Sequence, residues 1–249
     1  MTSRGQGDGG VDDKVGKTRV LEDVLDEVLS FNYRSLRTLR DIFLRPGTVA
    51  LAFLDGDRKR YTPPMRVWFG VLTWMFLLSM VWGGWGEIIW RISGDGAAFG
   101  DAVREGRRDM DAVRAAISTM AALLYVPIEA LLVLPGVIAL KSMRKGINFL
   151  RSTQCYFIPV TAGAVSSTLV LIASSIWPDI LKWAFPINTG IFVLIAAQVV
   201  HAGFSSGIAG LIGKTVLLTA VVTALSMLAR MLTLVISIFW ALAQVPPVS

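Results

Sequence analysis

Two charged residues lie near the middle of long apolar segments. Glu129 stands within residues 115–140 and Arg230 within residues 215–242. A lone charge in the hydrocarbon of a bilayer costs at least about 2.5–3.5 kcal/mol on insertion scales, and neither side chain is long enough to reach the interface from mid-span. We therefore predict that Glu129 and Arg230 pair across a helix bundle. The pair is either static, fixing the register of the helices, or part of a proton or substrate pathway.

A second polar group lies at the end of another apolar segment. Gln198 and His201 are three residues apart, so they share one helical face, and Lys214 follows the next loop. These residues could form a polar mouth, or His201 could be an ordinary half-hydrated interfacial histidine. The chain has a single His and a single Cys, Cys155, which excludes an internal disulfide and any multi-histidine or multi-cysteine metal site. We expect no catalytic residue, no cofactor and no metal, and therefore no enzyme.

A basic, turn-rich passage, RPGTVALAFLDGDRKRYTPP at residues 45–64, precedes the first long apolar run. Pro46 and Gly47 end one helix, a short apolar helix follows, and Gly56 turns the chain. Basic side chains beside a span meet lipid phosphates at about 1 kcal/mol each. This passage predicts either a topology anchor or a phosphate-binding pocket, with these candidate headgroup contacts: Arg45, Arg58, Lys59, Arg60 and Tyr61.

The composition places these residues in a membrane protein. Hydrophobic residues make up 54% of the 249 residues, charged residues only 17%, and the mean hydropathy is +0.61. About 20 apolar residues in a helix cross a bilayer. We predict an all-α integral membrane protein with about five transmembrane helices, preceded by amphipathic interfacial helices. The predicted spans are residues 67–90, 115–140, 156–177, 184–204 and 215–242.

The region before the first span divides into two parts. Residues 1–17 are polar and rich in Gly and Asp, and are predicted to be a disordered cytoplasmic tail. Residues 18–66 carry apolar residues at helical spacing, including a stripe of Leu36, Leu39, Ile42 and Phe43, and are predicted to lie at the interface. Residues 67–249 form the transmembrane domain.

Basic residues are unequal in the connections between the spans. One side has 17 Lys and Arg and the other has 6, so the positive-inside rule predicts a cytoplasmic N-terminus and an external C-terminus. The net charge of +6 fits contact with anionic lipid headgroups, and we expect no nucleic-acid partner. Small residues in the third span, such as Gly163 and Ser167, permit close helix packing within the bundle, or a homodimer.

An ordered set of residues carries a family resemblance. Arg45-Pro46-Gly47, then Gly56-x-Arg58-x-x-Tyr61, then Pro63-Pro64 before a span resembles a family of uncharacterised bacterial multi-pass inner-membrane proteins. Many members have an N-terminal zinc ribbon, whose cysteines this chain lacks. The resemblance covers about 30 residues, and it implies a location in the inner membrane but no activity.

Two functions remain open from the sequence. The first is a non-enzymatic scaffold or assembly factor that acts through contacts with lipid, with other membrane proteins or with itself. The second is a small transporter or channel subunit with a polar site around Glu129 and Arg230. A membrane-embedded enzyme ranks third, because no cluster of catalytic residue types accompanies these charges.

The pairing hypothesis makes a prediction about membrane accumulation. Glu129→Gln and Arg230→Gln should each lower the amount of protein in the membrane, because each leaves one charge without its partner in the hydrocarbon. The double variant Glu129→Arg, Arg230→Glu should restore accumulation, measured by immunoblotting of membrane fractions. Single variants that both accumulate like the wild type would show that no pair exists.

Overall fold

The structure of this chain is a computed structural model that describes residues 33–57, 59–82, 106, 108–174, 176–205 and 207–246. Every regular element in these ranges is helical, and the all-α prediction is confirmed. The elements are α2 (Tyr33–Leu44), α3 (Pro46–Asp55), α4 (Pro64–Trp82), α7 (Met110–Val133), α8 (Gly136–Ser142), α9 (Phe149–Ser174), the 3₁₀-helix η1 (Pro178–Trp183), α10 (Ala184–Gly203) and α11 (Ile208–Gln244). The predicted tail and residues 18–32 lie outside the described residues.

Four helical stretches among the described residues are long and apolar enough to cross a membrane. They are Met110–Ser142, Phe149–Ser174, Asp179–Gly203 and Ile208–Gln244, and they contain four of the five predicted spans, apart from the last residues of two of them. The remaining segment begins as predicted in α4, but its described part ends at Trp82, so the count of five spans stays a prediction. The chain is thus built as a helical membrane protein.

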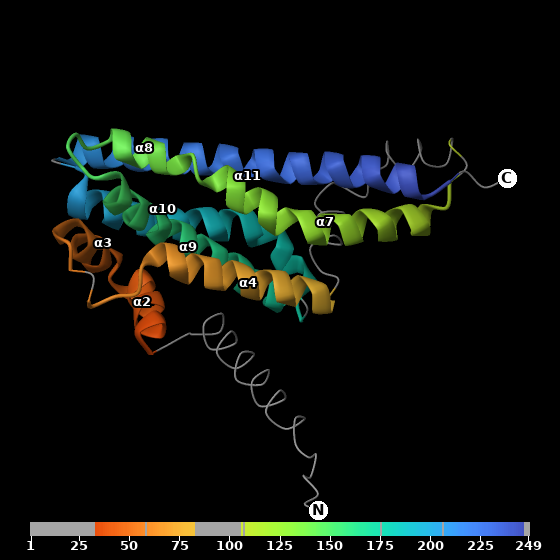
Figure 1. The fold of residues 1–249 in the computed structure, drawn as a ribbon, viewed down its shortest axis with the longest axis horizontal. Coiled ribbons are helices and arrows are strands. Elements are labelled where there is room, and N and C mark those ends of the chain that lie inside the picture. Colours follow the sequence, from red (N-terminus) through yellow and green to blue (C-terminus); the bar gives the residue numbers. More distant parts are fainter. Residues whose placement is uncertain are drawn as a thin grey trace, which may run out of the picture.

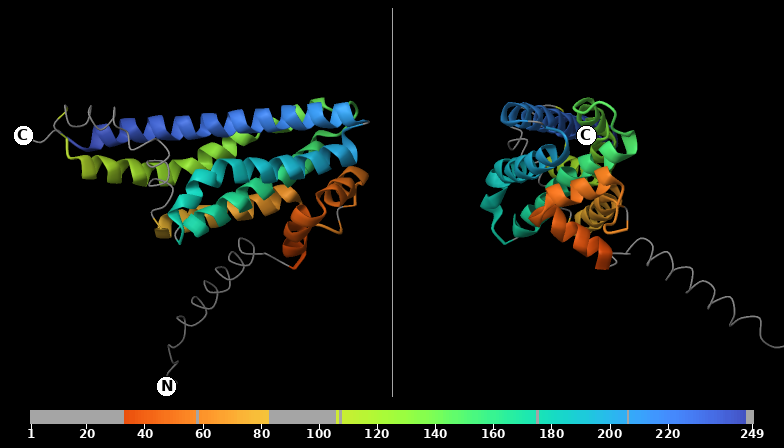
Figure 2. Two further views of the ribbon diagram at one scale, coloured as in Figure 1. Left: turned by 180° about the vertical axis from the view of Figure 1, so that it is seen from behind. Right: turned by 90° about the vertical axis from the view of Figure 1, so that its left-hand side faces the viewer.

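The helices form two layers with a small attachment at one end (Figures 1 and 2). The long helices α7 and α11 run side by side in one layer, and α4, α9 and α10 pack against them in the other. The helices α2 and α3 lie at the end where α4, α9 and α11 begin. The connections that are rich in Lys and Arg, which the positive-inside rule placed on one side of the membrane, therefore meet at this end. We call it the collar end, and we call α2, α3 and the loop before α4 the collar.

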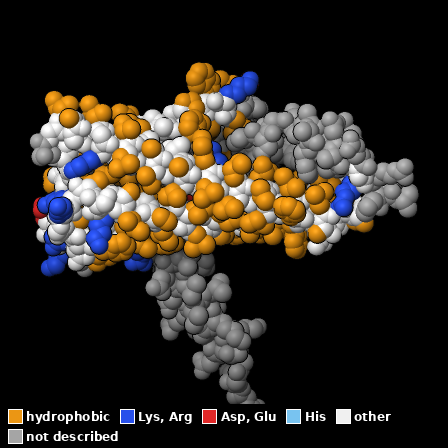
Figure 3. Space-filling view, turned by 90° about the horizontal axis from the view of Figure 1, so that it is seen from above, with side chains coloured by type: hydrophobic (Ala, Val, Ile, Leu, Met, Phe, Trp, Pro, Cys, Tyr) orange, Lys and Arg blue, Asp and Glu red, His pale blue; other side chains and the backbone are white. Residues whose placement is uncertain are grey.

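The surface has the charge distribution expected of such a bundle. In Figure 3, hydrophobic side chains cover the length of the upper layer, while Lys and Arg side chains gather mainly toward its ends. Exposed apolar residues on α11 include Val216, Met231 and Phe239. Such a band suits contact with lipid tails.

The helix α9 is the centre of the bundle. Of its most apolar 18-residue stretch, 61% is buried inside the protein, against 33%, 28% and 22% for the corresponding stretches of the other three candidate spans. It contacts α3, α4, α8 and α10, and Ala162 is completely buried. Ala162 thus packs within the bundle, whereas Gly163 and Ser167 are only half-buried, and the homodimer alternative stays a prediction.

The predicted second span is interrupted near its end. The helix α7 stops at Val133 and α8 starts at Gly136, because Pro135 lacks the N–H that would continue the helix. The interruption leaves the Val133 carbonyl without a helical donor, and the Tyr156 hydroxyl donates to it at 2.6 Å. A side chain on Gly136 would collide with the ring and hydroxyl of Tyr156. The break thus depends on a glycine and a tyrosine that meet across two helices.

Cationic side chains close the ends of other helices. Arg151 Nη1 donates to the carbonyl of Leu54 at the end of α3, at 2.6 Å, and Arg144 Nη1 donates to that of Gly203 at the end of α10, at 2.8 Å. At the opposite end of the bundle, Arg108 donates to the last carbonyls of α11. Helix C-termini carry unpaired carbonyls and partial negative charge, so these cations stabilise them.

The contact at the α7–α8 break predicts the effect of two substitutions. Tyr156→Phe should destabilise the protein by about 0.6–1.7 kcal/mol, the range for hydrogen bonds between membrane helices. Gly136→Ala should cost about 1–3 kcal/mol, because the methyl group overpacks the interface. Thermal unfolding of the purified protein in detergent measures both. Gly213→Ala is the control, since nothing lies near the added methyl group on α11. A Gly136→Ala variant as stable as this control would contradict the close contact between Gly136 and Tyr156.

Candidate functional site

A cavity of about 120 Å³ lies inside the bundle, between the two layers. Its walls come from all five long helices, α4, α7, α9, α10 and α11. Trp68, Leu72 and Phe192 contribute apolar surface. The polar side chains that line it are Tyr125, Glu129, Ser167, Asn188, Thr189, Thr219, Thr223, Ser226 and Arg230. Both charged residues that the sequence singled out therefore face one cavity.

Glu129 reaches the cavity from α7 and hydrogen-bonds a side chain of α11. Its Oε1 accepts from Ser226 Oγ on α11 at 2.9 Å. Its Oε2 is buried and has no hydrogen-bond partner within the described part of the chain. Because a carboxylate has about four lone-pair positions, this group retains unused acceptor capacity.

Arg230 faces the same cavity from α11. Within the described residues its guanidinium makes no ion pair with Glu129, since no N–O distance between them is 4.0 Å or less. Tyr125 interacts electrostatically with both charged groups. The structure thus brings both charged side chains to one cavity, where Tyr125 interacts with each of them. A direct ion pair between Glu129 and Arg230 stays a prediction.

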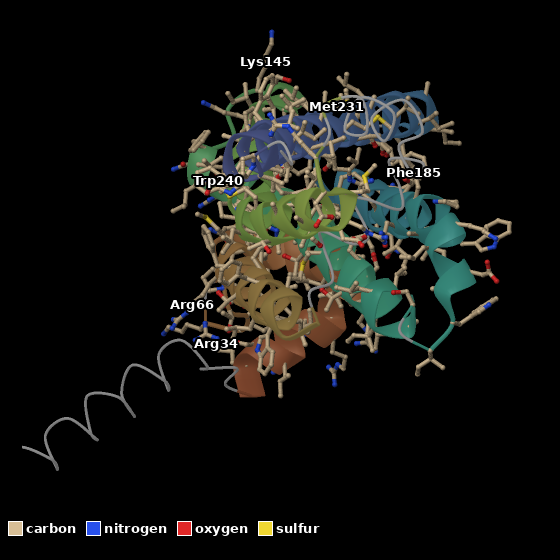
Figure 4. All side chains as sticks on the ribbon, turned by 90° about the vertical axis from the view of Figure 1, so that its right-hand side faces the viewer. Arg34, Arg66, Lys145, Phe185, Met231 and Trp240 are labelled. Carbon is tan, nitrogen blue, oxygen red and sulfur yellow. The ribbon has the colours of Figure 1, made fainter. Side chains whose placement is uncertain are left out.

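One side of the cavity wall is thin. Phe185 and Met227 line the cavity, and their exposed fractions are nevertheless 48% and 51%. Figure 4 shows Phe185 on the side of the bundle where α10 faces α11. A lateral route from the bilayer to the cavity would therefore pass between these two side chains.

The collar end is organised by the polar face of α2. Ser35, Thr38 and Asp41 are buried, whereas Leu36 of the predicted apolar stripe is 53% exposed. Of that stripe only Ile42 is completely buried. The polar face of α2 therefore packs against the protein in the described part of the chain, because its side chains have hydrogen-bonding partners there.

These partners belong to the loop that leads into α4. Thr62 N donates to Thr38 Oγ1 at 2.9 Å, and the Tyr61 carbonyl accepts from Arg34 Nη2 at 2.9 Å. The next two residues are prolines, which have no N–H. The backbone of this loop cannot form all of its hydrogen bonds within the loop, so side chains of α2 supply the missing donors and acceptors. Arg34 and Arg66, at the outer edge of this contact, point outward on the same side of the bundle (Figure 4).

Tyr61 is the buried centre of the collar. It is completely buried, and its hydroxyl donates to Asp41 Oδ2 at 3.0 Å. Burial and the bond to Asp41 raise the pKa of Tyr61. Burial alone would raise the pKa of Asp41, but hydrogen bonds from Arg40 and Tyr61 and the nearby guanidinium groups hold it below its usual value. The prediction that Tyr61 contacts lipid headgroups is wrong, because its ring and hydroxyl face the protein interior.

Three of the other candidate headgroup contacts lie on the surface. Arg45, Lys59 and Arg60 are exposed, and Arg58 lies outside the described residues. The Arg60 guanidinium lies 5.3 Å from the centre of the Tyr61 ring, within the range of a cation–π contact. These side chains are therefore free to meet phosphates at the collar end while the tyrosine fixes the loop beneath them.

The predicted polar mouth is divided in the structure. Lys214 Nζ donates to the carbonyls of Met143 and Phe204, which end α8 and α10. Gln198 and His201 are exposed on α10, and neither hydrogen-bonds Lys214 within the described chain. Lys214 thus serves two helix ends. The described residues also contain no group of three His, Cys, Asp or Glu side chains placed to hold a metal ion.

Six polar cavity residues escaped the sequence analysis: Tyr125, Asn188, Thr189, Thr219, Thr223 and Ser226. Tyr125 stands four residues before Glu129 on α7, and Ser226 four residues before Arg230 on α11. The i, i+4 spacing on one helical face was the available signal. Asn188 had no such signal, because only the packing of α10 against α9 brings it to the cavity, where Ser166 Oγ donates to its Oδ1 at 2.6 Å.

Comparison with known proteins finds a family match for one part of the chain. Residues 34–76 match the family described as "Protein of unknown function (DUF3667)". The match covers α2, α3 and most of α4, which are the collar and the start of the first predicted span. No curated protein and no solved structure matches the chain. This short match agrees with the resemblance to an uncharacterised family.

The collar predicts the effect of changing Asp41. Asp41→Ala should destabilise the protein by about 1.5–3 kcal/mol, because the buried Tyr61 hydroxyl loses a charged acceptor. Asp41→Asn should cost less, since an amide oxygen still accepts this bond. Thermal unfolding in detergent measures the change, with the exposed Asp55→Ala as the control. Equal stability of Asp41→Ala and Asp55→Ala would exclude the proposed contact.

The same contact predicts a pH dependence. The folded pKa of Asp41 lies below its ordinary value of 3.8, so its contribution to stability is fully present above that value. The contribution is lost as the pH falls through the lower folded pKa. The difference in unfolding temperature between wild type and Asp41→Asn should therefore narrow below about pH 4. A constant difference down to pH 2 would contradict the charge effect.

Proposed function

We propose that this protein is a multi-pass membrane protein that takes up a small polar solute or headgroup inside its helix bundle, as a transporter or channel subunit would. The observation that carries this proposal is the cavity of about 120 Å³ that both Glu129 and Arg230 line. Charged residues within spans usually face a bundle interior or a water-filled cavity and mark pathways for ions or substrates.

Two features of the bundle support this function. Transporter sites lie near the middle of the membrane, beside helices that are interrupted. Glu129 lies about one turn before the break at Val133, and Pro127 and Pro159 stand within α7 and α9. A helix that lacks a backbone hydrogen bond bends at lower cost than an intact one, which suits a site that must open and close.

The collar favours the second candidate, a scaffold role through lipid or partner contacts. Arg45, Lys59 and Arg60 are exposed there beside exposed apolar side chains such as Leu44 and Leu51. On this proposal the collar lies in the cytoplasm and the C-terminus outside, in a bacterial inner membrane. The positive-inside bias and the family resemblance support this placement.

Cysteine labelling tests the solute-binding function. Cys155→Ala provides a cysteine-free background, since Cys155 is the only cysteine. In that background Ser167→Cys and Thr223→Cys, both in the cavity wall, should react with a small cationic methanethiosulfonate, because water reaches them and permits the thiolate. Leu169→Cys on the outer surface of α9, where Leu169 is 59% exposed, should stay unlabelled in lipid.

A collar position calibrates the labelling. Lys59→Cys is exposed at the collar end and should react fully when the reagent reaches that side. If Lys59→Cys reacts while both cavity cysteines remain as inert as Leu169→Cys, the cavity is dry. The solute-binding function is then wrong, and the scaffold role remains.

A further inference from the structure

We propose that the cavity binds a zwitterionic group, one that carries a protonated primary amine together with a carboxylate or phosphate. This inference rests on the proposed function and names the chemistry of the ligand. Its basis is that Glu129 and Arg230, which carry opposite charges, line one cavity and form no ion pair with each other in the described structure.

Arg230 and Asn188 indicate that one half of the ligand is anionic. The guanidinium of Arg230 remains protonated and presents up to five N–H donors in a planar fork that matches carboxylate and phosphate. The Oδ1 of Asn188 already accepts from Ser166, which leaves its amide nitrogen as a donor in the cavity wall. Tyr125 interacts with Arg230, but one hydroxyl cannot satisfy five donors, so an anion in the cavity would accept from the remaining ones.

Glu129 indicates that the other half of the ligand is cationic. Ser226 occupies Oε1, while Oε2 is buried without a partner. Thr219 Oγ1, also in the cavity wall, is likewise buried without a partner in the described structure. A buried acceptor without a donor is costly, more so when it is charged. A primary ammonium supplies three N–H donors and the opposite charge.

Ligands of a single charge fit this cavity less well. An anion would meet Arg230 but leave Glu129 unpaired and repelled, and a simple cation would do the reverse. A ligand with both charges pairs with both groups, and its own opposite charges offset each other in the low-dielectric interior. A water molecule needs about 10–15 Å³ of cavity, so about 120 Å³ holds a small group of several non-hydrogen atoms.

The same chemistry has two sources. A free amino acid or phosphoethanolamine would enter from water, and the headgroup of phosphatidylethanolamine would enter from the bilayer. The thin wall at Phe185 and Met227 gives the headgroup a lateral route. Phosphocholine carries the same charges but has no N–H donor for Glu129, and it therefore separates charge from hydrogen bonding.

Binding to the purified full-length protein in neutral detergent tests the proposal. Glycine and phosphoethanolamine are titrated by calorimetry beside three poorer ligands: ethylamine, inorganic phosphate and phosphocholine. At least one zwitterion with a primary amine should bind at least ten-fold more tightly than all three. Equal affinity for ethylamine or phosphate alone, or for phosphocholine, would overturn the proposal. This series requires no variant and is independent of how well any variant folds.

Variants assign the binding to the cavity. Glu129→Gln and Arg230→Gln should each weaken binding of the zwitterion at least ten-fold, whereas the controls Asp179→Asn and Lys182→Gln, which remove the charges of a surface ion pair, should not change it. Unchanged binding in folded Glu129→Gln and Arg230→Gln proteins would place the ligand elsewhere and overturn the assignment.

Nanodiscs separate the two sources. Protein in phosphatidylcholine discs doped with phosphatidylethanolamine should retain the latter through detergent extraction, measured by native mass spectrometry, if the headgroup is the ligand. Retention of phosphatidylglycerol instead would indicate a simple anion site and contradict the zwitterion. If neither soluble zwitterions nor phosphatidylethanolamine bind, the proposal is wrong. Labelled cavity cysteines would still support a water-filled solute site, so the two failures are distinguishable.

Discussion

The hydrogen-bonding needs of the peptide backbone govern this structure more than any other constraint. Within a bilayer no water satisfies an exposed N–H or C=O, so each interrupted or terminated helix requires a partner from the protein. The Tyr156 hydroxyl supplies one at the break after Val133. Arg144 and Arg151 supply others at the ends of α10 and α3. Where these partners lie determines how the helices meet.

The same requirement gives the basic residues of the collar end two roles. Some, such as Lys214, donate to helix carbonyls and are therefore part of the fold. Others, such as Arg45 and Lys59, are exposed and available to lipid or to a partner. A count of Lys and Arg per connection treats both kinds alike. The bias that orients a membrane protein and the capping of its helices can thus be carried by the same side chains.

A few buried side-chain oxygens of the described residues have no hydrogen-bond partner. Four are hydroxyls outside the cavity wall, those of Ser152, Thr215, Thr233 and Ser237, whereas Glu129 Oε2 and Thr219 Oγ1 lie together in that wall. Unpaired buried groups in a native protein require an explanation, such as an absent ligand or ordered water. Their position beside Arg230 and the interrupted α7 gives the proposed solute site its physical basis.

Local sequence properties predicted the class of the protein and where its charges lie. Hydropathy over about 20 residues indicated the long helices, and single charges within apolar runs indicated Glu129 and Arg230. Proline and glycine at residues 46, 47 and 56 correctly indicated the end of α2 and the turn after α3, where Gly56 has a φ of 88°. Each of these signals is contained in a few neighbouring residues, and so one sequence suffices to read it.

Only the tertiary structure decided which polar groups meet. The inward face of α2 is polar because Thr38 and Asp41 find partners 20 or more residues away in the loop before α4. Glu129 meets Ser226, 97 residues distant, and five helices together enclose the cavity. Periodicity within one segment carries no information about such partners, because a cavity is the space that remains after separate helices have packed.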